Sequence, residues 1–268
     1  FLQNITPGMD IEISQEFMKI LKKQGIKFHM QHKVESVKKG KSGAIVTTSD
    51  KDGNKNNFEC NVVLISVGRK PNTNGLKLEK IGIELDAKKR IKTNKNFQTN
   101  IENIYAIGDV IAGPMLAHKA SEEGVMVAER IADHDVGLNY DHVPNVIYTH
   151  PEVAWVGLNE SQLKDQGIDF KSGSFPFLAS GRALASGESA GSVFITADNE
   201  TDKILGIQVF GPSAAEILQQ GLIAMDQGVT SENLSKTIFS HPTVSEALHE
   251  ATLAMNNKAI HIQNRKKK

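Results

Sequence analysis

The segment Ser240–Glu246, close to the C-terminus, carries residue types that can transfer protons. His241 stands in front of Pro242, and Glu246 follows five residues after the histidine. A histidine side chain titrates near neutral pH, so it can accept and return a proton under ordinary conditions. A carboxylate that holds one ring nitrogen makes the other a better base. The pattern therefore indicates a candidate general base, His241, with Glu246 as its partner.

The same residues also have a purely structural interpretation. Thr243 and Glu246 match a capping box, in which two side chains pair with free backbone N–H groups at the start of a helix. The helix that follows would carry its apolar residues on one face: Val244, Leu248, Ala251 and Met255. This interpretation explains Glu246 and leaves His241 unexplained, and the two interpretations are compatible.

A second candidate site follows an apolar run at residues 62–67, which predicts a strand covered on both faces. The run ends at Gly68, within the turn Gly68–Asn72. Ligands of α/β proteins bind beyond the carboxyl ends of such strands. A tight turn without any ligand explains Gly68 equally well.

A third candidate lies at the end of the stretch Thr99–Asp109, which predicts a turn and a short strand. Gly108 allows close backbone approach, and Asp109 offers an acceptor for a sugar-like hydroxyl. A helix is expected next, and its first N–H groups could meet an electron-rich ligand. Small or apolar residues would share one face of that helix: Ala120, Gly124, Val127, Ala128 and Ile131.

The elements that must position these residues follow from periodicity. Asp10 is a plausible N-cap for a helix that ends at Gly25, and strands are expected at 26–30, 33–38 and 44–48. A hairpin at Asp52–Gly53 returns the chain into 57–60. After a polar boundary at 133–144, an α+β arrangement is expected. Its strands are 146–148, 153–156, 173–177, 192–197 and 204–210, and its helices are 213–228, opened by a capping box at Ser213–Glu216, and 231–236.

Composition excludes several classes of protein. With 39% hydrophobic residues in 268, the chain is typical of globular folds. Lys+Arg and Asp+Glu number 31 each, which gives no electrostatic case for nucleic acid or an anionic membrane as partner. No apolar run reaches the roughly 20 residues that span a bilayer. The nine histidines and the single cysteine lack metal-binding spacing, so no metal site is expected.

Four motifs, taken together and in order, resemble the disulfide-reducing flavoenzymes. The resemblance covers essentially the whole chain and is closest to the dihydrolipoamide dehydrogenase branch of the class I pyridine nucleotide-disulfide oxidoreductases. Residues 115–118 and the Ser245-Glu246 pair resemble this branch more than glutathione or mercuric reductases. The motifs are Gly68–Asn72, Thr99–Asp109, Met115–His118 and His241–Glu246.

The resemblance implies an α/β plus α+β fold in three parts. Residues 1–69 would be the C-terminal part of a Rossmann-like NAD-binding domain, 70–143 a returning segment of the central, FAD-contacting domain, and 144–268 an α+β dimerisation domain. It further implies oxidation of protein-bound dihydrolipoamide with NAD⁺ as acceptor, in a homodimer that serves the lipoyl domain of a 2-oxo-acid dehydrogenase complex. The implied location is the bacterial cytoplasm or the mitochondrial matrix.

The resemblance also assigns roles to residues. His241 would take a proton from the dihydrolipoyl thiol with Glu246 as its partner, at the flavin and disulfide of the other subunit. Asp109 would hold the ribityl chain of FAD. Gly68 and Val34 would line the NAD site. The backbone that would lie against the flavin is that of Met115, Leu116, Ala117 and His118.

The chain also departs from the family pattern. The family has a cysteine pair and two glycine-rich phosphate loops, whereas this sequence has only Cys60, which matches no redox position. Residues 1–8 read as a connection within a longer chain, so this chain alone is expected to be inactive. The alternatives are a glutathione- or mercuric-reductase-like member of the family, or a non-catalytic dimerising fragment.

Overall fold

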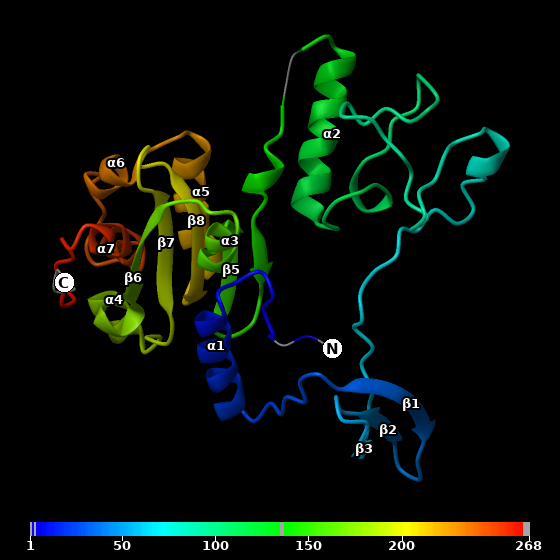
Figure 1. Cartoon of the computed structure of the whole chain (residues 1–268), viewed down its shortest axis with the longest axis horizontal. Coiled ribbons are helices and arrows are strands. Elements are labelled where there is room, and N and C mark those ends of the chain that lie inside the picture. Colours follow the sequence, from blue (N-terminus) through cyan, green and yellow to red (C-terminus); the bar gives the residue numbers. More distant parts are fainter. Residues whose placement is uncertain (1, 3, 135–136, 265–268) are drawn as a thin grey trace. The chain divides into compact units, whose positions relative to one another are not determined.

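The computed structural model describes residues 2, 4–134 and 137–264 (Figure 1). They form two compact units. The larger unit combines Phe1–Val62 with Asp141–Lys268, and the smaller unit is Val63–Tyr140.

A five-stranded antiparallel sheet forms the centre of the larger unit (Figure 1). Its strand order is β4-β5-β8-β7-β6, so the last strand in sequence, β8, lies in the middle. All five strands were expected from the sequence and are confirmed within a few residues. They are β4 (Asn145–Ile147), β5 (Glu152–Gly157), β6 (Phe170–Pro176), β7 (Ser192–Asp198) and β8 (Ile204–Gly211).

Helices pack on this sheet and close the main hydrophobic core. Helix α5 (Ala214–Asp226) packs on β5 and β8, and α7 (Glu246–Met255) packs on β6 and β7. Side chains from both helices and the sheet are fully buried between them, including Ile207, Ile217 and Leu248. The remaining short helices of this part are α3 (Glu160–Asp165), η4 (Phe177–Ala179), α4 (Gly181–Ser186) and α6 (Ser231–Ser235).

The predicted capping box at the start of α5 is wrong. Ser213 adopts a left-handed backbone conformation, with φ of +51°, and its side chain makes no capping hydrogen bond. The carboxylate of Glu152, on β5, accepts a hydrogen bond from the Ala215 N–H at 3.4 Å instead. A side chain from a neighbouring strand thus replaces the local cap.

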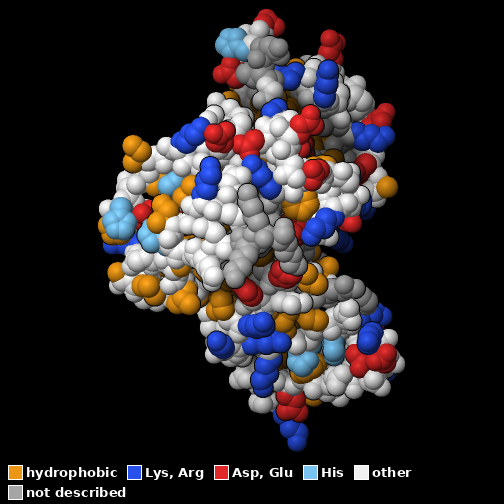
Figure 2. All heavy atoms as spheres, turned by 60° about the vertical axis from the view of Figure 1, so that its left-hand side comes forward, with side chains coloured by type: hydrophobic (Ala, Val, Ile, Leu, Met, Phe, Trp, Pro, Cys, Tyr) orange, Lys and Arg blue, Asp and Glu red, His pale blue; other side chains and the backbone are white. Residues whose placement is uncertain are grey.

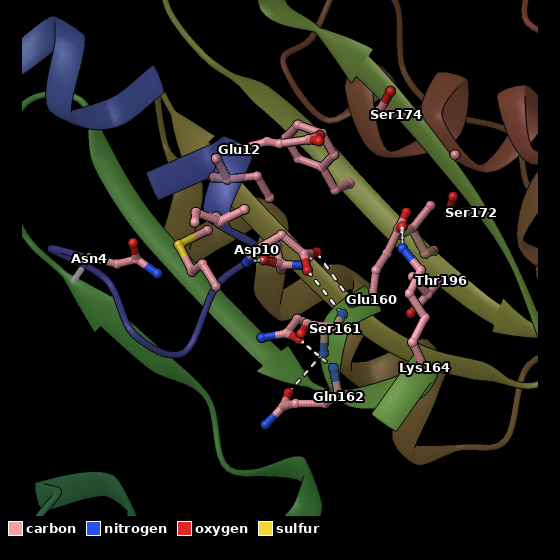
Figure 3. Close-up of a pocket in the computed structure, with 18 of the residues that line it drawn as sticks. Asn4, Asp10, Glu12, Glu160, Ser161, Gln162, Lys164, Ser172, Ser174 and Thr196 are labelled. Atoms are coloured by element: carbon pink, nitrogen blue, oxygen red, sulfur yellow. Dashed lines mark hydrogen bonds and ion pairs between the residues drawn. The ribbon is translucent and has the colours of Figure 1, made fainter. Parts of the chain in front are cut away.

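The first helix, α1 (Ile11–Lys23), is confirmed and packs on the same sheet through Ile13, Phe17 and Leu21. Asp10 is its N-cap residue, yet the side chain does not cap α1. Its carboxylate accepts hydrogen bonds from the Gln208 side chain at 2.6 Å and from the N–H groups of Glu160 and Ser161 at 3.3 Å. Figure 3 shows these contacts in a cavity of about 580 Å³ between α1, α3 and the sheet. They fasten the start of α1 to segments about 150 and 198 residues away.

A three-stranded antiparallel meander completes the larger unit. It consists of β1 (Lys33–Lys39), β2 (Ala44–Ser49) and β3 (Lys55–Cys60). The predicted hairpin is confirmed, because Gly53 has φ of +84° and the Asp50 carboxylate accepts the N–H groups of Asp52 and Asn54 at 2.9 Å. The strand predicted at 26–30 is wrong: this segment is irregular and pairs with no strand of the described chain.

The strand predicted at 62–67, covered on both faces, is also wrong. The segment pairs with no strand among the described residues, and both sheets there are antiparallel. Without a neighbouring ladder, neither face of the segment is covered. Its large apolar side chains are therefore exposed: Val62 by 81%, Leu64 by 88%, Ile65 by 74% and Val67 by 90%.

The smaller unit is built from loops and 3-10 turns around one long helix, α2 (Ala117–Ile131). Its short helical turns are η1 (Leu78–Lys80) and η2 (Gly108–Val110), and η3 (Tyr140–His142) begins at its last residue. The predicted strand before Gly108 is reduced to one bridge between Gln98 and Tyr105. The core consists of Leu78, Ile83, Ile91, Phe97, Ala106, Ile111 and Met126.

The predicted face of α2 is confirmed only in part, because Ala120, Gly124 and Val127 are half-buried. Ala128 and Ile131 are exposed, whereas Lys119, Glu123 and Met126 are buried. Two charged side chains therefore occupy the inner face, and they contact each other as described below. Among the described residues, no helix combines the length and the apolar character required to cross a membrane.

Candidate functional site

His241 and Glu246 are in direct contact, as expected from the sequence. The histidine Nδ1 lies 2.9 Å from Glu246 Oε1. Because a carboxylate only accepts hydrogen bonds, Nδ1 must carry a proton, and in the neutral ring Nε2 is then the nitrogen with a free lone pair. The His241 side chain is 73% exposed. The arrangement thus presents an oriented base to a molecule arriving from outside this chain.

The start of α7 fixes the position of Glu246. Its second oxygen, Oε2, accepts the N–H of Thr243 at 2.9 Å. The Thr243 hydroxyl donates to the carbonyl of Ser240 at 2.8 Å, so only the glutamate half of the predicted capping box forms. Ser245 takes the N-cap position. Glu246 therefore serves the helix and the histidine at once, one oxygen for each.

The surroundings of Glu246 favour its charged form. Desolvation acts to raise the pKa of this carboxyl group, but the hydrogen bonds from the Thr243 N–H and from His241 lower the pKa below its ordinary value. Glu246 is 24% exposed as a side chain. A carboxylate at this position can stabilise a positive charge that develops on the ring during proton transfer.

Sequence reasoning missed a cavity of about 380 Å³ beside this pair. The His249 ring stacks on Phe239 in its wall, with ring centroids 4.9 Å apart, and the carboxylate of Glu250 accepts the N–H groups of Ile260 and His261. Ile260 lines the cavity and is exposed. Figure 2 shows hydrophobic and histidine side chains close together on the exposed surface. No local pattern marks these residues, because the cavity forms only when the C-terminal segment folds back onto α7.

Asp109 lies in the smaller unit, at a turn that requires glycine before it. Gly108 has φ of +70°, and a Cβ atom there would lie 3.0 Å from the Cβ of Ala120. The Oδ2 atom of Asp109 accepts a hydrogen bond from Arg69 at 2.6 Å. Arg69 directly follows Gly68, which has φ of +118°. The structure thus connects two of the predicted sites through Arg69, a contact that sequence reasoning missed.

The residues predicted to lie against a flavin occupy the start of α2. Met115 and Leu116 are half-buried and Ala117 and His118 are exposed. Leu116 is the N-cap residue, and its side chain makes no capping hydrogen bond. The remaining predicted residue, Val34, lies exposed on β1 in the larger unit.

These features fit an isoalloxazine with its ribityl chain. The side-chain-free turn at Gly108 allows close approach, and Asp109 supplies an acceptor for a hydroxyl group. The uncapped start of α2 suits an electron-rich ring edge. Among the described residues, no group of three or more His, Cys, Asp or Glu side chains is arranged to hold a metal ion.

Two family profiles match the chain. Residues 1–124 match the family described as "Pyridine nucleotide-disulphide oxidoreductase", and residues 143–252 match its dimerisation domain. The two matches cover both halves of the chain, and the second contains His241 and Glu246.

Curated relatives agree with these profiles. The chain is 47% identical over 263 residues to "Dihydrolipoyl dehydrogenase 1, mitochondrial" of Arabidopsis thaliana, a match that covers 98% of this chain and 52% of that protein. It is 48% identical over 249 residues to "Dihydrolipoyl dehydrogenase, mitochondrial" of Mus musculus, covering 92% of this chain and 49% of the relative. The chain thus spans about half the length of the curated relatives it matches.

Solved structures share the fold. LpdA from Mycobacterium tuberculosis superposes with a TM-score of 0.83 at 25% identity, over 91% of this chain and 52% of that chain. The HOCl-induced flavoprotein disulfide reductase RclA from Escherichia coli superposes with a TM-score of 0.85 at 24% identity, over 93% of this chain and 57% of that chain.

Proposed function

The chain belongs to the pyridine nucleotide-disulphide oxidoreductase family, and we propose that it supplies the general base of an enzyme that oxidises protein-bound dihydrolipoamide with NAD⁺. The observation that carries this proposal is the contact between His241 Nδ1 and Glu246 Oε1, which leaves Nε2 as an exposed base. The names of the relatives from Arabidopsis thaliana and Mus musculus support dihydrolipoamide as the substrate.

In the proposed reaction, Nε2 of His241 accepts the proton of a dihydrolipoyl thiol. The S–H bond breaks, its electron pair stays on sulfur, and a new N–H bond forms on the imidazole. Glu246 stabilises the resulting imidazolium, since its carboxylate lies within hydrogen-bond distance of the opposite ring nitrogen. When bound, FAD would pass two electrons from the dithiol, by way of the cysteine pair of the family, to NAD⁺, a chemistry that the described side chains of this chain do not supply.

We assign the flavin contact to the smaller unit. Asp109 would accept hydroxyl groups of the ribityl chain, and the start of α2, residues 115–118, would meet the ring edge. Gly68 and Val34 would line the NAD⁺ site. We propose the domain division expected from the sequence: 1–69 for the NAD-binding part, 70–143 for the FAD-contacting part and 144–268 for dimerisation.

The proposed assembly is a homodimer formed through residues 144–268. The match of 143–252 to a dimerisation domain supports it, and several large apolar side chains of this part are exposed: Leu178, Leu184, Ile223, Ile238 and Ile260. The lipoyl domain of a 2-oxo-acid dehydrogenase complex is the proposed macromolecular substrate. The location that suits this role is the mitochondrial matrix or the bacterial cytoplasm, and the names of the two relatives describe them as mitochondrial.

A substrate panel tests the proposal. The holoenzyme, meaning a protein of the relatives' full length that contains this chain and FAD, is assayed with dihydrolipoamide and NAD⁺, with glutathione disulfide, and with mercuric ion. Turnover of dihydrolipoamide should exceed that of the other two substrates. Faster reduction of glutathione disulfide or mercuric ion would refute the substrate assignment. Size-exclusion chromatography with a flavin absorbance scan of the 268-residue chain addresses the alternative of a colourless, dimerising module.

A further inference from the structure

The inner face of α2 carries a buried ion pair that the proposed reaction does not use. The side chains of Lys119 and Glu123 are 1% and 0% exposed, and Nζ lies 2.8 Å from Oε1. Removing two charges from water costs several kcal/mol per ion unless the partners and further hydrogen bonds compensate. The ion pair therefore has to be compensated by further contacts, and these contacts indicate what it does.

The glutamate connects the pair to the turn that carries Asp109. Its Oε2 atom accepts the backbone N–H of Gly108 at 2.7 Å, and Oε1 accepts the hydroxyl of Tyr140 at 2.5 Å. Desolvation, together with the hydrogen bond and the charge of Glu123, raises the pKa of the Tyr140 hydroxyl. Gly108 has no side chain by which packing could hold it, so backbone hydrogen bonds fix this turn: its N–H donates to Glu123, and its carbonyl accepts the N–H of Ile111 at 3.3 Å.

The lysine reaches the other end of the same loop. A Cβ atom placed on Gly113, where φ is +116°, would lie 3.1 Å from Lys119 Cε and 3.5 Å from Nζ. The backbone of Gly113 therefore lies directly against the lysine side chain. The Lys119 ammonium makes the ion pair with Glu123 but no hydrogen bond of regular geometry within the described part of the chain. The pair thus contacts both ends of the loop Gly108–Gly113.

We propose that Lys119 and Glu123 are positioning residues that hold the loop Gly108–Gly113, and with it the Asp109 carboxylate, in the conformation that binds the ribityl chain of FAD. This inference rests on the proposed flavin site. A hydrogen bond from an N–H group to a carboxylate is roughly twice as strong as a neutral one, and the Lys119 ammonium lies 2.8 Å from that carboxylate. The ion pair acts on the flavin only through the loop.

The test uses Glu123→Gln, Lys119→Met and the double variant, which replaces the pair by two neutral side chains of similar length. The matched control is Lys236→Met, which removes the lysine of an exposed i,i+4 pair with Glu232. In the 268-residue chain, NMR of the Gly108 amide should show an upfield shift and at least about 10-fold faster hydrogen exchange in Glu123→Gln. Ultraviolet titration should show a lower pKa for Tyr140 in the same variant.

Binding of the flavin is measured as the dissociation constant of FAD from the full-length enzyme after its own FAD has been removed. It should rise at least about 10-fold in Glu123→Gln and in Lys119→Met, and the double variant should lose less than the product of the two single losses. Lys236→Met should match the wild type. If a single variant does not fold, the double variant decides, because it buries no unpaired charge.

Two outcomes would overturn the inference. One is an unchanged Gly108 amide in Glu123→Gln. The other is an altered amide with FAD affinity equal to the wild type in the folded variants, which would make the pair purely structural. A wild-type apoprotein of the relatives' full length that binds no FAD would instead refute the proposed function, and the inference about the flavin with it.

Discussion

Replacing Glu246 by Gln should reduce the rate of thiol oxidation without removing the base. The carboxylate uses Oε1 for His241 and Oε2 for the Thr243 N–H, both at 2.9 Å. A glutamine has one acceptor oxygen, so it can serve only one of the two donors and carries no charge for the imidazolium. A hydrogen bond to a charged group contributes about 1.5–3 kcal/mol, and solvent exposure of His241 reduces this value to about 1–2 kcal/mol. The expected loss in kcat is therefore roughly 5- to 30-fold.

The assay is steady-state reduction of NAD⁺ by dihydrolipoamide in the holoenzyme. Because Glu246 acts through His241, the double variant His241→Gln/Glu246→Gln should be no slower than His241→Gln alone, within about 2-fold. Glu232→Gln removes an exposed carboxylate on α6 and serves as the matched control. An unchanged rate in Glu246→Gln, or independent losses that multiply in the double variant, would show that Glu246 does not act through His241.

Two further predictions concern the framework around the site. Gly173→Ala places a Cβ atom about 2.0 Å from the carbonyl oxygen of Ala251 on α7. This substitution should lower the free energy of unfolding by about 1–3 kcal/mol, measured by urea titration. An unchanged urea midpoint would contradict the close approach of the two backbones. Asp202→Asn should cost about 1–3 kcal/mol, because the carboxylate accepts from Lys171, Ser231 and the Glu232 N–H. Desolvation acts to raise the pKa of Asp202, but these hydrogen bonds and the Lys171 charge lower it below its ordinary value. The contribution of the carboxylate to folding stability is therefore present above the unfolded pKa of about 3.9 and is lost as the pH falls through the lower folded pKa. The free energy of unfolding of the wild type should therefore fall more than that of Asp202→Asn between about pH 5 and pH 2. Parallel curves of this free energy against pH would exclude the role of Asp202.

Features that depend on one short stretch of chain could be predicted from the sequence. The spacing of Ile13, Phe17 and Leu21 defines one face of one helix, and all three are buried. Each of the five strands of the large sheet lies within a few residues of the range expected from its own segment of sequence. His241 and Glu246 are only five residues apart, so a turn and a helix start suffice to bring them together.

Features that depend on a distant partner could not be predicted. The apolar run at 62–67 indicates a strand, but its composition does not say which strand pairs with it. The Asp10 carboxylate was expected to cap α1, and the competing N–H groups of Glu160 and Ser161 lie about 150 residues away in sequence. On α2, the i,i+4 spacing of Lys119 and Glu123 is ordinary for an exposed pair, so hydropathy identified only the half-buried part of the inner face, Ala120, Gly124 and Val127, and missed the charged pair.

The central claim is that His241 removes the thiol proton of dihydrolipoamide. Rapid-mixing measurement of flavin reduction by dihydrolipoamide, in the wild-type holoenzyme and in His241→Gln, tests this claim most directly because NAD⁺ is absent from the reaction. The rate in the variant should be at least about 100-fold lower, the scale of general acid–base contributions. Flavin reduction at the wild-type rate in the variant would exclude His241 as the base.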